Sequence, residues 1–347
     1  MNIWRDSLKA VQIVEPGKID IIDMPIPEMK DNELIVRINY IGLCGSDLNT
    51  FCGVNPLVSY PLIPGHEISG NIYKVGSKVP AIYRKGIKVT VSPYSHCGKC
   101  SACLSGRVNC CVNNKTLGVQ KDGAACEYLA VSFEKVFPVE NLKDKTITLI
   151  EPLSIGLHAV KRAKICNEDV ICVFGCGMIG LGVVFSSALI SKCVIAVDIQ
   201  DEKLEKARNL GADYCINADK KNIDEALRKI TREKGVNVIF EAVGSVEIFE
   251  NAIEIINNAG RIITIGYTKE VAKIETKKIV NKEIDIIGSR NALNDEIRQV
   301  IDIVSESEEK LDKVITQTYG VDEAERAFSY WVQSRPLVTK IVLNTAS

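Results

Sequence analysis

Residues 170–198, VICVFGCGMIGLGVVFSSALISKCVIAVD, decide the fold. The apolar residues 170–174 have the length of a buried strand, and a helical run follows them before a second apolar strand ends at Asp198. Gly175, Gly177 and Gly180 form the pattern G-x-G-x-x-G between the first strand and the helix. Glycines in this position let the backbone approach a pyrophosphate at the N-terminus of the helix. The stretch therefore predicts a dinucleotide-binding βαβ unit.

The acid at the end of the second strand indicates which dinucleotide is bound. Asp198 lies 18 residues after Gly180, where a carboxylate accepts hydrogen bonds from the adenosine ribose and repels a 2′-phosphate. No arginine follows it in residues 199–203, IQDEK. We therefore expect NAD rather than NADP, with further contacts from Ile179 and Lys203.

Strands alternate with helices from about residue 150 onward, which predicts a doubly wound parallel sheet. The downstream strands are expected at 214–216, 236–241, 261–265 and 284–288. The intervening helices are expected at 201–210, 222–233 and 246–257. The chain should end with helices at 294–305 and 321–333 and a strand at 338–343.

The first third of the chain shows short strand patterns without intervening helices. These strands are expected at 9–14, 18–23, 33–41, 68–75, 86–91 and 124–131. Such a run predicts a compact β-rich domain. Since single hydrophobic cores stop growing near ~250–300 residues, a chain of 347 residues should contain two domains.

Charge and hydropathy exclude several classes of protein. The chain has 43 basic and 44 acidic residues, a net charge of −1, and no lysine or arginine block that would favour nucleic acid or an anionic membrane. No window approaches the ~18 apolar residues of a spanning helix, and the N-terminus lacks the apolar core of a signal peptide. We expect a cytoplasmic protein whose 13 cysteines bind metal or fill the core.

Five of these cysteines gather in residues 97–111. Four of them fit the pattern C-x2-C-x2-C-x7-C, namely Cys97, Cys100, Cys103 and Cys111, and Cys110 is a spare. Four thiolates at such short spacing can wrap one ion in the closed tetrahedral arrangement of a structural zinc site. Cys111 is preferred to Cys110 on spacing alone. The stretch lacks the aromatic and basic pattern of a nucleic-acid finger.

A second candidate metal site combines residues from the two ends of the stretch 41–67. Cys44 follows one strand-like run, and His66 precedes another. A thiolate and an imidazole brought together by two strand ends suit zinc, and a catalytic zinc keeps three protein ligands and one open position. The third ligand would be an acid, either the adjacent Glu67 or the distant Glu151. The residues leave that choice open.

These residues resemble the zinc-dependent medium-chain alcohol dehydrogenases, most closely the sorbitol or polyol dehydrogenase branch. The resemblance covers essentially the whole chain, and the cysteine lobe and glycine pattern follow in the family's order. The family's zinc pattern reads here as Gly65-His66-Glu67-x-x-Gly70-x5-Gly76-x-x-Val79. Glu151-Pro152-Leu153 resembles the acidic position of the polyol branch, where other branches carry a second cysteine.

The resemblance implies an α/β fold of two domains. A β-rich GroES-like catalytic domain would comprise residues 1–152 and 290–347, and a Rossmann domain would comprise residues 153–289. Zinc, substrate and nicotinamide would meet in the cleft between them. Arg290 resembles an arginine that reaches cofactor or substrate in the polyol branch. The family also implies a homodimer or a homotetramer.

The implied reaction is the reversible oxidation of a secondary alcohol to a ketone with hydride transfer to NAD. Ser46 would accept the hydroxyl proton and pass it to a ribose hydroxyl of the cofactor, and Asp47 would orient a metal ligand. Asn49 stands where many members carry a histidine that passes the proton to solvent, so water would complete the route. A second departure, Ile87-Lys88-Val89 after a glycine, concerns a turn.

Hydrogen-bonding side chains after the metal cysteine favour a polyol or a sugar acid as substrate. These residues are Asn49, Asn55, Ser59 and Tyr60. One alternative is an amino-alcohol substrate, as in the threonine dehydrogenases of the same architecture. Another is a zinc-stabilised nucleotide-binding sensor without turnover. The four-cysteine lobe and the pair Cys44 and His66 argue against a zinc-free reductase.

Overall fold

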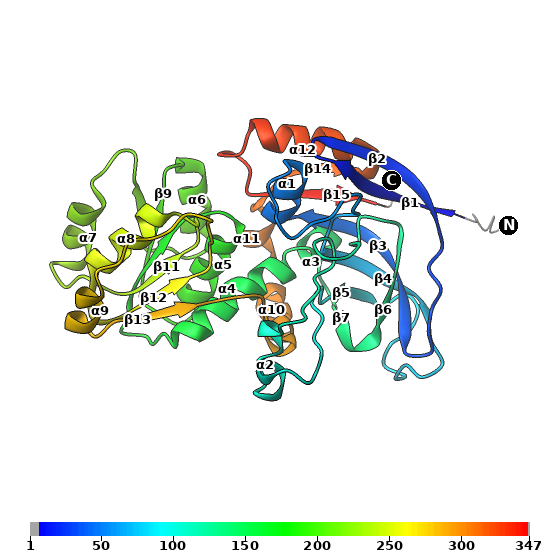
Figure 1. Cartoon of the computed structure of the whole chain (residues 1–347), viewed down its shortest axis with the longest axis horizontal. Helices are drawn as coiled ribbons and strands as arrows, with labels where there is room; N and C mark the ends of the chain where they lie inside the picture. Colours follow the sequence, from blue (N-terminus) through cyan, green and yellow to red (C-terminus); the bar gives the residue numbers. More distant parts are fainter. Residues whose placement is uncertain (1–6, 346–347) are drawn as a thin grey trace. The chain divides into compact units, whose positions relative to one another are not determined.

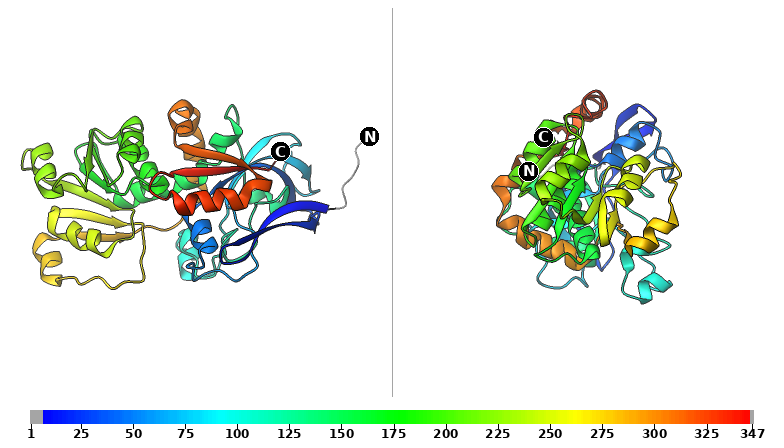
Figure 2. Two further views of the ribbon diagram at one scale, coloured as in Figure 1. Left: turned by 90° about the horizontal axis from the view of Figure 1, so that it is seen from above. Right: turned by 90° about the vertical axis from the view of Figure 1, so that its left-hand side faces the viewer.

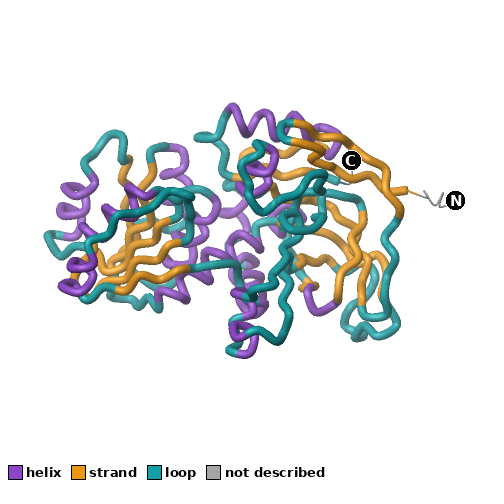
Figure 3. The backbone as a smooth tube through the Cα atoms, viewed as in Figure 1, coloured by secondary structure: helices purple, strands orange, loops and turns teal. Residues whose placement is uncertain are grey.

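The computed structural model describes residues 7–345 and divides the chain into two compact units. One unit comprises Met1–Glu151 and Ile297–Ser347, and the other comprises Pro152–Glu296. Both transitions fall inside helices, namely α4 (Ile150–Ala163) and α10 (Asn294–Ser305). Figure 1 labels the elements along the chain, and Figure 3 distinguishes helices, strands and loops. Within the described residues, no helix is both long and apolar enough to cross a bilayer.

The middle unit is built around one six-stranded parallel sheet in the order β10-β9-β8-β11-β12-β13. Its strands are β8 (Val170–Phe174), β9 (Cys193–Asp198), β10 (Tyr214–Asn217), β11 (Val236–Glu241), β12 (Ile256–Thr264) and β13 (Asp285–Gly288). Its helices are α5 (Met178–Ala188), α6 (Asp201–Asn209), α7 (Ile223–Thr231), α8 (Val246–Ile255) and α9 (Thr276–Lys282). This order confirms the predicted doubly wound sheet.

The order in which the strands are connected indicates which edge of this sheet is suited to bind a ligand. The chain runs outward from β8 through α5 and α6 in one direction, and outward from β11 through α8 and α9 in the other. Because parallel crossovers are right-handed, the two helix pairs cover opposite faces of the sheet, as Figures 1 and 2 show. The order reverses between β8 and β11, and doubly wound sheets bind ligands at the carboxyl ends of the strands beside such a reversal.

The other unit contains a seven-stranded sheet and a separate hairpin. The sheet has the order β14-β15-β3-β4-β5-β7, with β6 also paired to β3. Its strands are β3 (Glu33–Leu43), β4 (Glu67–Val75), β5 (Lys88–Val91), β6 (Tyr128–Ser132), β7 (Val136–Pro138), β14 (Ile315–Gly320) and β15 (Lys340–Asn344), and the hairpin is β1 (Ser7–Glu15) with β2 (Lys18–Pro25). Its helices are α1 (Gly45–Phe51), α2 (Ser101–Leu104), α3 (Asp144–Ile147), α11 (Glu308–Asp312) and α12 (Ala324–Gln333), with short 3₁₀ turns at 108–110, 133–135 and 321–323.

Segments from both ends of the chain meet in this unit. The C-terminal strand β15 pairs antiparallel with β3, so that Ile341 lies opposite Leu43. Helix α12 packs against β2, and Figures 1 and 2 show the red helix beside the blue hairpin. Phe51 and Phe328 stack in the core between α1 and α12, with ring centroids 5.1 Å apart. Helix α1, which follows Cys44, is therefore supported by residues near the other end of the chain.

Two of the predicted strands need correction, and two strands were not expected. The strand expected at 124–131 begins only at Tyr128, because the backbone before it bonds elsewhere: the N–H groups of Gly123 and Ala124 donate to Ile63 and Gly65 at 2.7 and 2.9 Å. Strand β12 begins at Ile256, five residues earlier than expected, with an irregular register against β11. Strands β7 and β14 were not expected.

Candidate active site and metal lobe

The candidate catalytic metal site lies where β3 and β4 meet α1. Cys44 follows β3 and is the N-cap of α1, His66 directly precedes β4, and Glu67 is the first residue of β4. One ligand atom from each of these residues lies within 4.8 Å of the others. The structure thus brings Cys44, His66 and Glu67 together, and a donor set of one sulfur, one nitrogen and one oxygen fits a zinc ion.

The state of His66 supports the same assignment. His66 is buried, and its Nδ1 atom has no hydrogen-bond partner among the described residues. A buried imidazole nitrogen without a partner is costly unless a further group satisfies it. Burial works to lower the pKa of His66, but the charges of Asp47 and Cys44 outweigh it and raise the pKa well above the ordinary value. A site whose anionic groups favour one extra positive charge in this way also attracts a cation.

Asp47 ties the two ligand-bearing segments together. Its side chain is fully buried. Oδ2 accepts a hydrogen bond from the Cys44 backbone N–H at 2.8 Å, and Oδ1 accepts one from the Gly65 N–H at 3.2 Å. Oδ1 also lies 3.9 Å from Nδ1 of His66. Asp47 therefore fixes both backbones, and its role in orienting a metal ligand stays a prediction.

Glu67 is paired with a buried lysine from the last strand. Nζ of Lys340 lies 2.5 Å from both carboxylate oxygens of Glu67, and it also donates to the Leu43 carbonyl at 3.0 Å. Both side chains of the pair are almost completely buried. Gly42 lies opposite Glu67 in the sheet, and a methyl group at Gly42 would come within 2.1 Å of the carboxylate. The carboxylate thus occupies a space that only glycine leaves open.

Glu151 reaches the same region from the first turn of α4. It is buried, and its Oε1 atom accepts a hydrogen bond from the Tyr94 hydroxyl. Burial raises the pKa of Glu151, while the nearby charge of His66 lowers it. Glu151 is not a member of the cluster of Cys44, His66 and Glu67. Both acids therefore lie near the metal site, each with a partner of its own.

The candidate proton-transfer and substrate residues lie on and after α1. Ser46 is half-buried in the first turn of α1, and Asn49 is exposed one turn later. The Tyr60 hydroxyl donates to the Thr50 carbonyl at 2.5 Å, and Asn55 Nδ2 donates to Thr50 Oγ1 at 3.1 Å. Asn55 and Tyr60 thus use polar groups to order this loop, whereas Asn49 and Ser59 are exposed.

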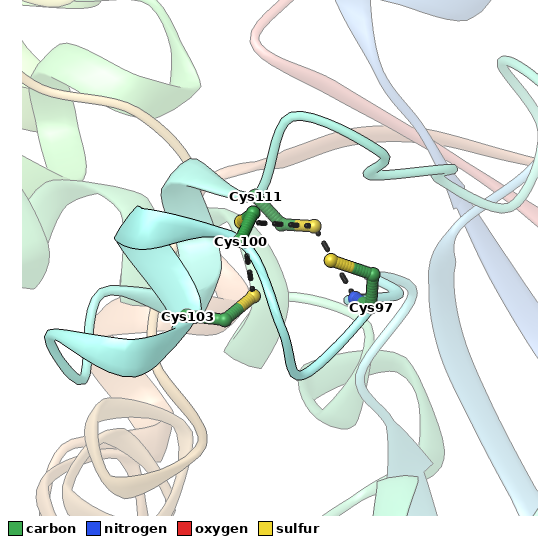
Figure 4. Close-up of side chains that lie close together, drawn as sticks. All are labelled: Cys97, Cys100, Cys103 and Cys111. Carbon is green, nitrogen blue, oxygen red and sulfur yellow. Dashed lines mark hydrogen bonds between the residues drawn. The ribbon is translucent and has the colours of Figure 1, made fainter.

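The four cysteines of residues 97–111 form a compact second metal lobe. Sγ of Cys100 lies 3.5 Å from Sγ of Cys103 and 3.9 Å from Sγ of Cys111, and all four sulfurs lie within 4.8 Å of one another. Figure 4 shows the side chains of Cys97, Cys100, Cys103 and Cys111 pointing toward one another. Tetrahedral zinc with bonds of about 2.3 Å places its sulfurs about 3.8 Å apart, so the cluster fits this ion.

The backbone of the lobe also favours the metal-binding form of Cys97. Backbone N–H groups of Lys99 and Cys100 lower the pKa of the Cys97 thiol to about 6. Metal ligation needs the thiolate, so this local environment supports binding at neutral pH. Cys110, the spare cysteine, lies 3.6 Å from a nitrogen of Arg107 and is outside the cluster.

The glycine loop after β8 has the shape that a phosphate-binding turn requires. Gly175 has φ +88°, a conformation that favours glycine. A methyl group at Gly180 would lie 1.7 Å from the Gly175 carbonyl oxygen, so the helix must start in close contact with the loop. Gly177 is the N-cap of α5, and the half-buried Ile179 follows in the first turn of that helix.

The other predicted nucleotide contacts lie along the same edge of the sheet. Asp198 ends β9, and its two oxygens accept hydrogen bonds from the Cys176 and Gln200 backbone N–H groups at 2.7 and 2.9 Å. A carboxylate has about four lone-pair positions, so Asp198 retains capacity for a ribose. Lys203 is half-buried in α6, and Arg290 is exposed just after β13.

Three residues of these sites were missed from the sequence. Lys340 is a lone lysine within the apolar run 338–343, and that exception to the pattern was a usable signal. Glu241 ends β11, and its buried Oε1 accepts hydrogen bonds from the N–H groups of the loop that follows, including that of Gly244 at 2.7 Å. Tyr94 carries no signal in the sequence, since only the fold brings it to Glu151.

Comparison with known proteins agrees with this arrangement. Residues 30–141 match the alcohol dehydrogenase GroES-like domain, and residues 179–306 match the zinc-binding dehydrogenase family. L-galactonate-5-dehydrogenase of Escherichia coli K12 is 31% identical over 86% of each chain, and sorbitol dehydrogenase of Bacillus subtilis is 28% identical over 97% of each. The structure of the RspB alcohol dehydrogenase of E. coli CFT073 with NADH matches with a TM-score of 0.91 and 31% identity, over 98% of this chain and 100% of that one. The chain belongs to the zinc-dependent medium-chain alcohol dehydrogenase family, in its polyol-type branch.

Proposed function

We propose that this protein is a zinc- and NAD-dependent oxidoreductase that reversibly oxidises a secondary alcohol of a polyol or sugar acid to the ketone. The observation that carries the proposal is the convergence of Cys44, His66 and Glu67 within 4.8 Å at the ends of two paired strands. The similarity to a sorbitol dehydrogenase and to an L-galactonate-5-dehydrogenase supports the substrate class. The NADH complex of RspB supports the cofactor.

The metal would be held by Cys44, His66 and one of the two acids, Glu67 or Glu151. When bound, zinc supplies Lewis acidity toward the alcohol oxygen and NAD supplies the hydride acceptor. Asp47 keeps the backbones of Cys44 and of Gly65, the residue before His66, in place by accepting a hydrogen bond from each N–H group. Lys340 neutralises Glu67, so that a second buried anion beside the thiolate does not stand unpaired.

Ser46 is the proposed proton acceptor because its hydroxyl follows the metal cysteine by two residues and is half-buried. Asn49, one turn further along α1, is exposed and does not titrate. Water would therefore complete the route of the proton from Ser46. This route predicts that the enzyme is active even though the side chain at position 49 cannot take up or release a proton near neutral pH.

The nucleotide would bind at the carboxyl edge of the parallel sheet. Gly175, Gly177 and Gly180 would admit the pyrophosphate, Ile179 would contact it, and Asp198 would bind the adenosine ribose. Lys203 and Arg290 are further proposed contacts. Residues 153–289 would thus form the NAD domain, and residues 1–152 and 290–347 the catalytic domain. We also propose a homodimer or homotetramer, to be tested by light scattering of the purified protein.

Metal analysis combined with an NADH absorbance assay tests the function. We expect two zinc ions per chain, reduction of NAD but not NADP, and turnover of hexitols or aldonates rather than threonine. Cys44→Ser and His66→Ala should abolish turnover while NAD still binds. One zinc per chain with no turnover would favour a nucleotide-binding sensor. Full activity in either variant would overturn the proposed metal centre.

A further inference from the structure

A clamp of hydrogen bonds closes the base of the four-cysteine lobe. The Ser95 hydroxyl donates to the Lys115 carbonyl at 2.8 Å and accepts a hydrogen bond from the Lys115 N–H at the same distance. The Leu117 N–H donates to the Pro93 carbonyl at 3.1 Å. The segments that enter and leave the lobe are thus held together at residues 93–95 and 115–117.

Tyr94 lies between the two clamped residues, Pro93 and Ser95. Its hydroxyl donates to Oε1 of Glu151, which is buried beside the candidate catalytic site. Glu151 is also one of the two acids proposed above as the third ligand of the catalytic metal. A short path of hydrogen bonds therefore joins the lobe to that proposed ligand, from the clamp through Tyr94 to Glu151.

The lobe is held in shape by little apolar burial. Its helix α2 has four residues, and the apolar side chains Leu104 and Val112 are each 76% exposed. A segment that leaves its large apolar side chains in water gains little from hydrophobic burial. Ligand bonds to four thiolates are then its main source of stability, as in other small metal-bound segments.

We propose that Tyr94 is a positioning residue that couples the state of the four-cysteine lobe to the catalytic metal centre. An ordered lobe fixes Tyr94 through the clamp, and Tyr94 fixes the carboxylate of Glu151 beside Cys44 and His66. Loss of the lobe metal loosens the clamp and with it Glu151. This inference rests on the proposed function only in that it assumes a metal at Cys44 and His66.

Cobalt binding tests the coupling without cofactor or substrate. The catalytic site of protein that retains zinc in its lobe is titrated with Co²⁺, and the d–d absorption is recorded. Removing a side chain that orients a metal ligand typically costs 10–100-fold in affinity. We expect Tyr94→Phe to weaken Co²⁺ binding by about that factor and to shift the absorption band, while the melting temperature stays close to that of the wild type.

A matched control is Tyr83→Phe in the same unit. The Tyr83 hydroxyl donates to the Val136 carbonyl at 3.2 Å and has no role in the metal site. This variant should bind Co²⁺ like the wild type. If Tyr83→Phe weakens Co²⁺ binding as much as Tyr94→Phe does, the effect is general loosening of the unit, and the coupling is overturned.

A double-mutant cycle separates transmission through Tyr94 from independent effects. Ser95→Ala breaks the clamp without removing a metal ligand, and Cys103→Ser damages the lobe directly. Either change should weaken Co²⁺ binding in the wild-type background and have little further effect in Tyr94→Phe, because coupled residues are not additive. Should Cys103→Ser fail to fold, Ser95→Ala completes the cycle alone.

The possible results distinguish this inference from the proposed function. Additive effects of Ser95→Ala and Tyr94→Phe, or normal Co²⁺ binding by Tyr94→Phe, would overturn the coupling and leave the proposed oxidoreductase intact. Failure of the wild type to bind Co²⁺ at Cys44 and His66 would overturn both.

Discussion

The two candidate metal sites are built in opposite ways. All four ligands of the lobe lie within residues 97–111, and its backbone needs only a short clamp at its base. The catalytic set takes Cys44 and His66 from two strands and depends on Lys340, a residue 273 positions beyond Glu67. The lobe is a local structure that the metal holds in shape, whereas the catalytic set is placed by the sheet and exists before the metal binds.

Because of this difference, the free energy that orders the ligands comes from a different source in each site. In the lobe the free energy of metal binding is also the free energy of ordering the chain. In the catalytic set that ordering comes from the packing of β3, β4 and β15, together with buried charges that must be neutralised. Removing metal should therefore affect the lobe, and removing a buried charge should affect the sheet.

Metal removal should produce the largest effect, with the loss of backbone hydrogen-exchange protection confined to the lobe. Structural zinc in small domains contributes roughly 10–16 kcal/mol of apparent binding free energy. We expect dialysis against a strong chelator to abolish hydrogen-exchange protection in residues 97–111, while β3 and β4 keep theirs. Mass spectrometry of the exchanged peptides measures both regions in one sample. Equal loss of protection in the strands would show that the contrast between the sites is wrong.

Lys340→Met should have the next largest effect, confined to the sheet. Breaking a buried ion pair by removing one partner typically costs about 3–5 kcal/mol, because the other charge remains buried alone. We expect a clear fall in the melting temperature of metal-free protein, with lobe zinc affinity unchanged. Adding Glu67→Gln should restore much of the loss, since both charges are then gone. No recovery in the double variant would speak against the pair as the cause.

Asp47→Asn should have a smaller effect on the same sheet. An asparagine keeps one acceptor oxygen but turns an NH2 group toward one of the two backbone N–H donors, those of Cys44 and Gly65. An unsatisfied buried polar group costs about 1–3 kcal/mol. Thermal unfolding of the metal-free protein measures the loss. Asp31→Asn, at an exposed site beside Ser77 and Lys78, is the control and should change little.

Thiol reactivity should show the smallest effect, a difference in rate rather than in stability. In the ordered lobe, backbone N–H groups of Lys99 and Cys100 lower the pKa of Cys97 to about 6. Because metal removal should disorder the lobe, these contacts are lost, and the pKa of Cys97 should return toward the ordinary thiol value of ~8.5. Burial raises the pKa of Cys126 to about 12. We expect iodoacetamide to label Cys97 of the metal-free protein at a rate that keeps rising above pH 7, and Cys126 to stay unlabelled below pH 9. Peptide mapping measures both rates.

The local parts of this molecule were predictable from sequence, and the contrast between the two sites explains why. The lobe and the glycine loop each place their residues within about fifteen positions, so spacing alone predicts their geometry. The doubly wound sheet was also readable, because its strands are short apolar runs that alternate with helices.

What could not be predicted depends on contacts between distant segments. The backbone of residues 123–125 bonds to the loop before His66, which shortens the strand expected there. Strand β14, ITQTYG, has the β-branched pattern of a strand, yet its pairing with β15 was invisible without the fold. Tyr94 and Lys340 matter only through partners that lie 57 and 273 positions away.

The pairing of Glu67 with Lys340 also has a consequence for biosynthesis. At 5–20 residues per second, a ribosome needs roughly 14–55 s to add the 273 residues that separate them. During that interval the middle unit, which is continuous in the chain, can fold as it emerges, while the nascent first unit holds an acid whose counter-charge has not yet been made. Truncation ahead of position 340 would release a polypeptide with a finished nucleotide half and an unfinished sheet, a natural substrate for chaperones and proteases.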